Sequence, residues 1–337
     1  MNIRQVAKLA RVSTATVSRV INSSAPVSEK TAERVRRAVK QLNFYPNTHA
    51  RTLGSGRSRM YGLIISDITN PFFPELVKSF EDIAVRHGQE VIVANTDYQP
   101  KRMETCVRRM LERKVDGVAI MTSEMEPGLV EMLSQRGIPM VFLDTGIVGP
   151  KTSNIEIDYA GGVGLAIDHL SALGHTRIAF ISGPMELKSV RIRHEAFHSA
   201  LERKGVPDFP ELIRHGNHRI DGGHQAMSEL LQLKEPPTAV LASNDLTAIG
   251  AMGAIHAAGM KVPTDISVIG CDDIELSSFT EPPLTTIHTS RTEIGTRAFT
   301  AVYEVNSSPA GHGADYKIPA TLVLRKSTAP VRKKAKT

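Results

Sequence analysis

The sequence predicts an α/β protein in which a small all-α head precedes two doubly wound subdomains, each built on a parallel sheet. Two observations lead to this fold class. From residue 61 onward, short β-branched runs alternate with amphipathic helical stretches in two successive series, which is typical of parallel sheets covered by helices on both faces. The first 59 residues show only helical periodicity, and their charge is opposite in sign to that of the region that follows.

The charge of the chain is uneven along its 337 residues. Residues 1–59 hold twelve Lys and Arg against two Glu, a net charge of +10, whereas residues 60–324 have a net charge of −10. A basic head on an acidic body indicates that the head binds a polyanion such as nucleic acid. The last thirteen residues add six basic residues, and we interpret the final RKKAKT as a solvated end.

The composition is that of an ordinary soluble globular protein, with 41% apolar and 23% charged residues. We find no apolar run that could span a bilayer and no signal segment, so we expect a cytoplasmic protein. Cys106 and Cys271 show no CxxC or Cys/His spacing and are expected to be buried thiols. We expect no metal and no cofactor, because we interpret the twelve histidines as scattered without ligand spacing.

Three helices are predicted in the head. Asn2, Ser13 and Ser28 each precede a stretch with apolar residues at helical spacing, and each is a suitable N-cap. The first two helices are separated by residues 11–13 alone, a turn typical of the helix-turn-helix unit.

The second of these helices, residues 14–22, has two unlike faces on a wheel of 100° per residue. One face carries apolar residues that are expected to join the first helix in a small core: Val6, Leu9, Val17, Val20 and Ile21. The other face carries short polar side chains and one long cation, which suit a DNA major groove: Thr14, Ala15, Thr16, Ser18, Arg19 and Asn22. We expect Arg19 to read a base, Thr14 and Ala15 to shape specificity, and the hydroxyls of Ser13, Thr16 and Ser18 to bind phosphates.

The segment YPNTHARTLGSGRSR, residues 45–59, predicts a hinge. Pro46 ends the third helix, and Asn47 can cap a helix of about two turns that is too short to be stable alone. We expect it to fold only against a DNA minor groove and the same segment of a partner subunit. Leu53 is the residue best placed to wedge between base steps, and His49 and Ala50 are expected to contact DNA with it.

The acidic body contains seven strand-like runs: YGLIIS, EVIVAN, DGVAIM and PMVFLD in the first series, and RIAFIS, TAVLAS and ISVIGC in the second. Helices are predicted near 74–87, 101–113, 127–136, 188–204, 222–233 and 245–258. Two such series indicate two doubly wound halves with a cleft between them. Ligands of open α/β sheets bind beyond the carboxyl ends of the strands, so the polar residues that follow the strands are candidate ligand contacts: Asp67, Asn70, Asp144, Asn244, Asp245, Asp272 and Asp273.

Several blocks together resemble the LacI/GalR family of bacterial transcriptional regulators: VAKLARVSTATVSRVIN, NTHARTLGSG, NPFF, LGHTRIAFISGP, SNDLTAIGAM and DDIELSSFTEPPLTTI. The resemblance runs from residue 2 to about residue 330. It implies the periplasmic-binding-protein type I fold, in which the chain crosses between the two halves three times, near Asp158, His288 and Pro319.

The resemblance also implies the domain organisation. We expect a helix-turn-helix domain over 1–45, a hinge helix and linker over 46–59, an effector-binding and dimerisation domain over 60–330, and a basic tail over 331–337. Within the third domain, the N-subdomain is expected over about 60–157 and 289–318, and the C-subdomain over about 158–287 and 319–330.

Matched by motif, the effector residues of the family fall on Asn70, Phe72, Asp144, Arg191, Asn244 and Asp272. Where several relatives place a stacking aromatic residue, this chain has His218, which we expect to be an effector contact. Taken singly, a loop Asp or Asn is more often a helix cap than a ligand contact, and Asn244 stands just before a predicted helix.

We therefore expect a dimeric transcriptional regulator, most simply a repressor, that binds a pseudo-palindromic operator under the control of a sugar or sugar derivative. No enzyme is expected, since neither a P-loop nor a GxSxG motif is present. The alternatives within the class are a regulator that answers to a purine corepressor or to a partner protein. The alternatives outside it are a cytoplasmic sugar-binding protein with no DNA role and a sugar-handling enzyme.

Overall fold

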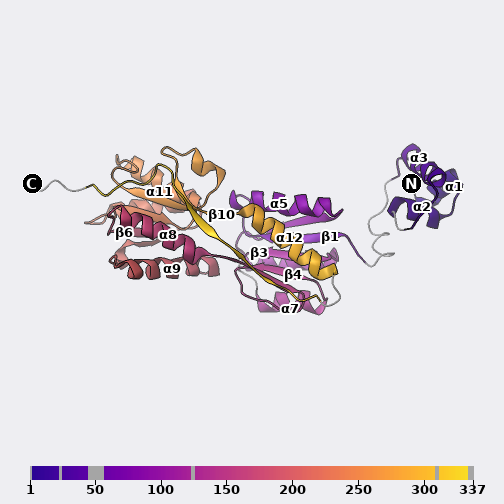
Figure 1. Ribbon diagram of the computed structural model, residues 1–337, viewed down its shortest axis with the longest axis horizontal. Helices are drawn as coiled ribbons and strands as arrows, with labels where there is room; N and C mark the ends of the chain where they lie inside the picture. Colours follow the sequence, from indigo (N-terminus) through magenta and orange to yellow (C-terminus); the bar gives the residue numbers. More distant parts are fainter. Residues whose placement is uncertain (1, 23–24, 45–56, 123–125, 308–310, 333–337) are drawn as a thin grey trace, which may run out of the picture. The chain divides into compact units, whose positions relative to one another are not determined.

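The computed structural model describes residues 2–22, 25–44, 57–122, 126–307 and 311–332. It divides into two compact units, Met1–Arg59 and Met60–Thr337, which are shown in Figure 1 and described here one at a time. The hinge predicted over residues 45–56, with His49, Ala50 and Leu53, lies outside the described residues.

The first unit, the head, consists of helices α1 (Ile3–Ala10), α2 (Thr14–Asn22) and α3 (Glu29–Gln41). Asn2 forms the capping box of α1: its side chain accepts from the Gln5 N–H at 3.1 Å, and its own N–H donates to Gln5 Oε1 at 2.9 Å. Ser28 precedes α3, but its hydroxyl donates to Thr31 Oγ1 and does not accept from a backbone N–H of the helix, so the expected side-chain cap is not formed.

The core of the head is small and aliphatic. Its buried members are Val6, Ala7, Ala10, Val17, Val35 and Ala38, and Val20 and Ile21 pack against them. The placement of Leu9 in this core was wrong, because 43% of that side chain is exposed. Val6, Ala7 and Ala10 already form the stripe of α1 that faces its neighbours, which leaves Leu9 on the flank of the helix.

The second unit contains two six-stranded sheets. The first sheet has the order β11-β5-β4-β3-β1-β2 and is parallel throughout. Its strands are β1 (Met60–Ile65), β2 (Glu90–Asn95), β3 (Gly117–Met121), β4 (Met140–Leu143), β5 (Thr152–Ile157) and β11 (Asp315–Ile318).

The second sheet has the order β12-β10-β9-β8-β6-β7, and in it only β12 runs antiparallel to its neighbour. Its strands are β6 (Ile178–Ser182), β7 (Ile213–His215), β8 (Ala239–Ala242), β9 (Ser267–Asp272), β10 (Thr285–Thr289) and β12 (Ala320–Val323). The predicted fold class, an all-α head followed by two doubly wound subdomains, is confirmed.

Helices cover both faces of each sheet. The first sheet is packed by α5 (Phe72–Arg86), α6 (Pro100–Glu112), α7 (Pro127–Gln135) and α12 (Arg291–Ser307), and this assembly is called the N-subdomain below. The second is packed by α8 (Tyr159–Ala172), α9 (Lys188–Lys204), α10 (Ile220–Leu231) and α11 (Asp245–Ala257), and this assembly is called the C-subdomain. Two short 3₁₀ turns, Pro210–Leu212 and Glu275–Ser278, complete the C-subdomain.

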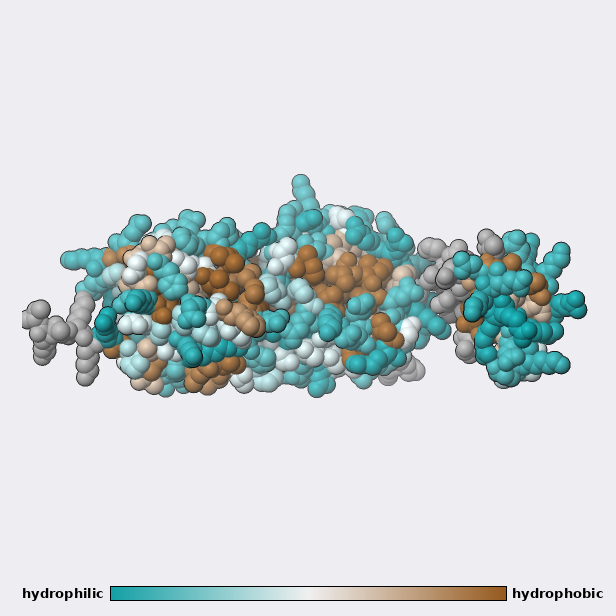
Figure 2. Space-filling model, turned by 90° about the horizontal axis from the view of Figure 1, so that it is seen from above, coloured by the Kyte–Doolittle hydropathy of each residue, from teal (hydrophilic) through white to brown (hydrophobic). Residues whose placement is uncertain are grey.

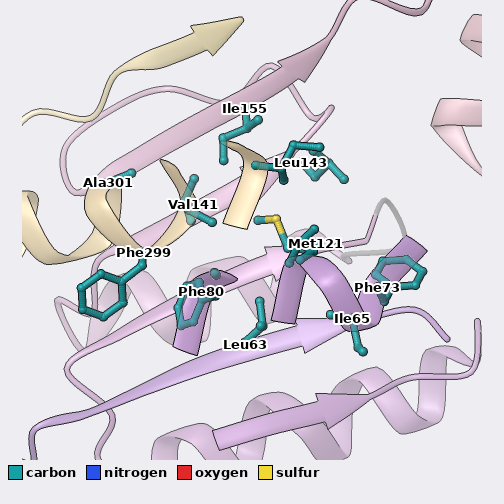
Figure 3. Packing of buried hydrophobic residues seen from close by; sticks show 14 of the residues in the cluster. Leu63, Ile65, Phe73, Phe80, Met121, Val141, Leu143, Ile155, Phe299 and Ala301 are labelled. Carbon is teal, nitrogen blue, oxygen red and sulfur yellow. The ribbon is translucent and has the colours of Figure 1, made fainter. Parts of the chain in front are cut away.

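Alternation along β1 places successive side chains in different cores. Leu63 and Ile65 belong to the cluster under α5 and α12, which also contains Phe80 and Phe299 (Figure 3). Ile64 belongs instead to the cluster on the opposite face of the sheet, under α6 and α7. Because both faces are buried, the strand is apolar at nearly every position, as parallel strands are.

The chain passes between the two sheets three times within this unit: from β5 to α8 at Asp158, from β10 to α12 at Ser290, and from β11 to β12 at Pro319 (Figure 1). At the first passage the glycines of AGGVGLA permit close packing. A Cβ on Gly162 of α8 would stand 2.6 Å from the Ile287 side chain of β10 and 2.9 Å from Ala320 of β12. None of the helices in the described ranges is long and apolar enough to cross a bilayer.

Candidate functional site

Two sets of residues are candidates for binding, one in each unit. In the head, α2 exposes Thr14, Ala15 and Arg19 and buries Val17. Thr16 and Ser18 lie half-buried at the edges of this face, and the Asn22 side chain is outside the described residues. The outward face predicted from the helical wheel is therefore the exposed one.

The start of α2 depends on Ser13 and on the turn before it. Ser13 Oγ accepts from the Thr16 N–H at 3.1 Å and lies 2.9 Å from Thr16 Oγ1. Arg11 adopts a left-handed conformation with φ of 54°, which ends α1 and begins the turn to α2. This cap and the buried Val17 stabilise a helix whose own propensity is poor.

The two acidic residues of the head, Glu29 and Glu33, are on α3. Arg36 bonds Glu29 at 2.7 Å along α3, and Arg37 lies 4.0 Å from Glu33 on the same helix. No acidic residue is present in α2 itself. The face of α2 is thus narrow, donor-rich and cationic, which suits insertion into a major groove.

In the second unit, a cavity that opens to solvent lies at the carboxyl ends of the strands of both sheets, and the empty space in it, its open side included, is about 620 Å³. Both subdomains line it. The N-subdomain contributes Ser66, Asn70, Phe72, Phe73, Tyr98, Met121, Thr122, Leu143, Asp144 and Ile157, and the C-subdomain contributes Tyr159, Leu187, Ser189, Arg193, His218, Asn244, Asp272 and Thr289.

Six of the seven effector residues expected from the sequence lie in this cavity: Asn70, Phe72, Asp144, His218, Asn244 and Asp272. Arg191 does not. Its side chain is exposed, and its Nη1 donates to the carbonyl oxygens of Met185 at 3.0 Å and Glu186 at 2.6 Å. Two positions on a helix are about 200° apart, so Arg193, two residues further along α9, points the opposite way and enters the cavity.

Arg193 is 6% exposed, and its guanidinium lies over the Tyr159 ring at 4.7 Å from the ring centroid. Its Nη2 reaches Ser189 Oγ at 3.4 Å. Its Nε is buried and has no hydrogen-bond partner among the described residues. Sequence reasoning missed Arg193, although helical spacing puts it on one face with the buried Val190 and Phe197.

His218 is buried beside Arg193. Desolvation, with a smaller contribution from the Arg193 charge, lowers the pKa of His218 to about 3, so its imidazole is neutral at pH 7. Its Nε2 is a second buried atom without a partner among the described residues. A buried polar atom left unpaired costs about 1–3 kcal/mol, and both of these atoms belong to side chains that line the cavity.

Two carboxyl groups face the same cavity. Burial raises the pKa of Asp144 to about 6, although its carboxylate accepts from the Ile157 N–H at 2.9 Å and the Tyr159 hydroxyl at 3.0 Å. Burial and the nearby Asp245 carboxylate raise the pKa of Asp272. Asp272 also has a left-handed φ of 113°, a sparsely populated conformation that recurs at functional sites.

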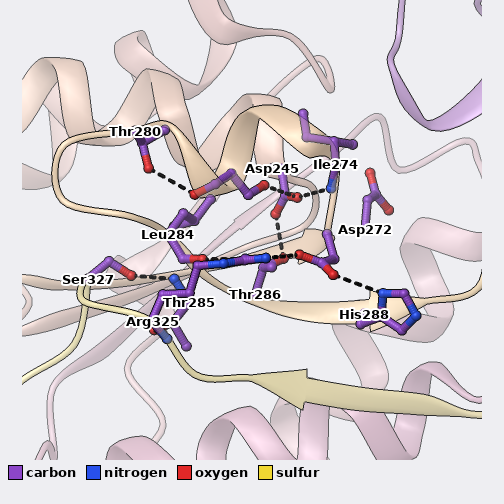
Figure 4. Close-up of polar contacts among 12 residues, drawn as sticks. Asp245, Asp272, Ile274, Thr280, Leu284, Thr285, Thr286, His288, Arg325 and Ser327 are labelled. Atoms are coloured by element: carbon purple, nitrogen blue, oxygen red, sulfur yellow. Dashed lines mark hydrogen bonds and ion pairs between the residues drawn. The ribbon is translucent and has the colours of Figure 1, made fainter.

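Asp245 holds the backbone around Asp272 in place. Its carboxylate accepts from the Ile274 N–H at 2.8 Å, Ser277 Oγ at 2.6 Å and Thr286 Oγ1 at 2.5 Å, as Figure 4 shows. All of its partners are protein groups of the C-subdomain. Asp245 is therefore a structural carboxylate that positions Asp272, and it does not line the cavity.

The two asparagines have capping roles as well. Asn70 Oδ1 accepts from the Phe72 N–H at 3.0 Å at the start of α5. Asn244 Oδ1 caps α11 by accepting from the Thr247 N–H at 2.9 Å, and its Nδ2 donates to the His218 carbonyl at 3.0 Å. Since both ends of the Asn244 amide are engaged, this side chain positions His218 at the cavity wall.

Comparison with known proteins agrees with this architecture. Residues 2–47 match the family model of bacterial regulatory proteins of the lacI family, and residues 167–328 match the periplasmic binding protein-like domain. The chain is 34% identical to the HTH-type transcriptional repressor PurR of Histophilus somni (strain 129Pt), over 96% of this chain and 98% of the relative. It is 38% identical to the ribose operon repressor of Escherichia coli (strain K12), over 87% and 89% of the two chains.

Solved structures give the same result. A lac repressor dimer bound to operator and the anti-inducer ONPF is 32% identical, with a TM-score of 0.87 over 98% of this chain and 99% of that one. A LacI family transcriptional regulator from Enterococcus faecium with bound ribose is 30% identical, with a TM-score of 0.74 over 81% of this chain and 100% of that one. The chain therefore belongs to the LacI family of bacterial regulatory proteins, and it is a DNA-binding transcriptional repressor with an effector-binding domain, not an enzyme.

Proposed function

We propose that this repressor acts in the cytoplasm as a homodimer that reads a pseudo-palindromic operator and answers to a sugar or sugar derivative bound in the cavity. The observation that carries the ligand class is a pair of buried polar atoms without partners among the described residues, Arg193 Nε and His218 Nε2, on two side chains that line the cavity together with Asp272. These groups donate to and accept from hydroxyls, which a sugar presents on adjacent carbons.

Each α2 enters one major groove of the operator. Arg19 reads a base edge, and Thr14 and Ala15 set how closely the helix approaches the bases. The hydroxyls of Ser13, Thr16 and Ser18 and the amide of Asn22 bind phosphates or base edges at the rim. The exposure of Thr14, Ala15 and Arg19 supports this assignment.

The hinge over 46–59 folds in the central minor groove with its partner copy, Leu53 wedges between base steps, and His49 and Ala50 contact the groove. These residues lie outside the described ranges, so this step rests on the sequence alone. Leu53→Ala is expected to reduce DNA bending in a circular-permutation gel shift, and an unchanged bend angle contradicts the wedge.

The cavity favours a small polyol over a stacked purine. A planar base gains most from stacking on an open aromatic face, whereas one face of the Tyr159 ring is covered by Arg193. Phe72 and Phe73 lie edge to face with each other, at 5.2 Å and 84°, and they offer an apolar wall for the carbon side of a sugar ring. The likeness to a ribose operon repressor and to a ribose complex supports this class; the likeness to PurR makes a purine the alternative outcome.

Dimerisation uses an apolar face of the second unit. Its exposed large apolar side chains include Ile68, Val85 and Val93 in the N-subdomain and Ile220, Leu276 and Phe279 in the C-subdomain. Figure 2 shows apolar side chains gathered on the face seen from above. A groove lined by Pro71, Ile220, Leu246 and Leu276 joins the two subdomains, and a patch of this kind marks a protein interface.

Regulation follows from the three passages of the chain between the sheets. A ligand that contacts both subdomains changes their angle, and in a dimer this moves the two N-subdomains relative to each other. Since a hinge of two turns is marginally stable, a small change in the spacing of its two copies decides whether it folds.

The test is a thermal-shift screen of the full chain against D-ribose, other pentoses and hexoses, sugar phosphates, hypoxanthine and guanine. A ligand at 100 times its Kd adds about 2.7 kcal/mol of stability, so a sugar is expected to raise the Tm by several degrees. Stabilisation by a purine alone overturns the sugar assignment. A gel shift with and without residues 1–59 then tests the DNA role, and retention of operator binding by the shortened chain contradicts it.

A further inference from the structure

One group of histidines departs from the scattered distribution expected from the sequence. His194 and His198 lie four residues apart on α9, within the pentapeptide HEAFH. This pentapeptide matches the HExxH pattern, whose i and i+4 histidines share one helix face and can bind a metal together. The expectation that no histidines have ligand spacing was therefore wrong at this place.

The structure brings the two imidazoles together. His194 Nε2 lies 3.2 Å from His198 Nε2, and the ring centroids are 4.4 Å apart. Two Zn–N bonds of about 2.0–2.1 Å at a tetrahedral angle separate the nitrogens by about 3.3–3.4 Å. The observed separation thus lies within a few tenths of an ångström of the spacing in a two-histidine chelate.

Asp208 holds one of these rings in the form that binds metal. Its Oδ2 makes a very short hydrogen bond with His198 Nδ1. A carboxylate on Nδ1 keeps the proton on that nitrogen and leaves the lone pair of Nε2 directed away from it, as it does for zinc-ligating histidines.

Both imidazole rings are accessible to an ion and are held in place by neighbouring aromatic rings. The His198 side chain is 34% exposed, and His194 is also partly exposed, so an ion reaches both rings from solvent. Phe180 and Phe197 pack against the two rings and restrict their orientations.

We propose that His194 and His198 chelate one divalent transition metal ion, of the kind that imidazole prefers, such as Zn²⁺ or Ni²⁺. Asp208 is the positioning residue, acting through His198. In the described part of the chain no three potential ligands gather at one point, so water completes the coordination. Glu195 is exposed to solvent, and no hydrolytic role is assigned to it.

The competing interpretation is a plain hydrogen bond in which His194 Nε2–H donates to His198 Nε2. Isothermal titration of the untagged full chain with Zn²⁺ distinguishes the two. Wild-type protein is expected to bind one Zn²⁺ per chain saturably and not to bind Mg²⁺, which prefers oxygen ligands. His194→Ala and His198→Ala are each expected to weaken Zn²⁺ binding at least tenfold.

Two further variants sharpen the result. Asp208→Asn is expected to weaken Zn²⁺ binding about 10–100-fold, as loss of a carboxylate partner does in other zinc sites. His256→Ala removes an exposed helical histidine of α11 and is expected to bind Zn²⁺ as the wild type does. His194→Gln and His198→Gln, checked by circular dichroism, repeat the test with side chains of similar size. Absence of saturable Zn²⁺ binding, or equal affinities of the wild type and the folded His194 and His198 variants, overturns the proposal.

Discussion

Arg219, immediately before α10 in the C-subdomain, donates from Nη2 to Oδ2 of Asp67, which follows β1 in the N-subdomain, at 3.1 Å. The same nitrogen lies 3.3 Å from Oδ1 of Asp97. Near the cavity, Arg291 bonds Glu75 at 2.7 Å and also donates to the carbonyl oxygens of Asp272 and Asp273. The ion pairs of Arg219 and the hydrogen bonds of Arg291 to the carbonyl oxygens of Asp272 and Asp273 thus join the two subdomains.

Arg219→Ala is expected to favour the open arrangement of the two subdomains. It is therefore expected to weaken the binding of D-ribose, or of whichever sugar stabilises the protein in the screen, about two- to fivefold. The effect is modest because the Arg219 side chain is 51% exposed, and pairs of this kind contribute about 0.2–1 kcal/mol. Isothermal titration measures it. The matched control is Arg214→Ala, which removes an ion pair with Glu229 at 3.2 Å inside the C-subdomain. Equal effects of the two variants contradict a link between Arg219 and closure.

Arg19→Ala is expected to cost about 1–3 kcal/mol on the specific operator and much less on random DNA, because a bidentate contact to guanine carries sequence information. Gel-shift titrations of both DNAs at fixed salt give the comparison. Arg34→Ala, an exposed arginine of α3, is the control, and any loss it causes is expected to be the same on both sequences. Equal losses for Arg19→Ala on the two DNAs remove its reading role.

Arg193→Ala is expected to weaken the binding of the sugar about 10–100-fold, since hydrogen bonds to a charged group contribute about 1.5–3 kcal/mol. Operator binding in the absence of the sugar is expected to be retained. Arg191→Ala serves as the control two residues away, with an exposed side chain bonded to two carbonyls of its own loop. It is expected to bind the sugar as the wild type does. A normal titration by Arg193→Ala shows that the cavity assignment is wrong.

The raised pKa of Asp144 predicts that the stability of the folded chain depends on pH. Burial raises its pKa to about 6 in the folded chain, against about 3.9 in an unfolded one. Between these values the folded chain keeps a proton that the unfolded chain has lost, so the free energy of unfolding falls as the pH rises from about 4 through about 6. The contribution of this group is about 2–3 kcal/mol.

Asp144→Asn is expected to flatten that dependence. Urea unfolding followed by circular dichroism at pH 4.5 and pH 7 gives the difference for each variant. Asp82→Asn, at an exposed position on α5, is the control and is expected to keep the wild-type difference. A difference for Asp144→Asn that matches the wild type rules out titration of this buried carboxyl as the cause.

Local pattern alone determined much of the molecule. The wheel of residues 14–22 buries Val17 and exposes Ala15 and Arg19, as the structure does. The run EVIVAN coincides with β2, and the helix predicted over 188–204 coincides with α9. These features depend on the periods of 3.6 residues in a helix and 2 residues in a strand, and the local sequence alone shows these periods.

Short edge elements needed the assembled sheets. β11 and β12, of four residues each, pair with β5 and β10, which lie far away in the sequence. A segment of that length has too few residues to show a period, so its strand character comes from the partner it meets.

Only the tertiary structure decided which side chains come together in the cavity and beside α9. The motif match assigned the ligand contact to Arg191, but the orientation of α9 leaves Arg191 in solvent and places the Arg193 guanidinium over the Tyr159 ring. In the same way, a loop returns Asp208 to His198 across ten positions of sequence. Such contacts depend on where whole helices and strands lie in space. Burial and hydrogen bonding between residues far apart in the sequence produce no periodic pattern from which they could be predicted.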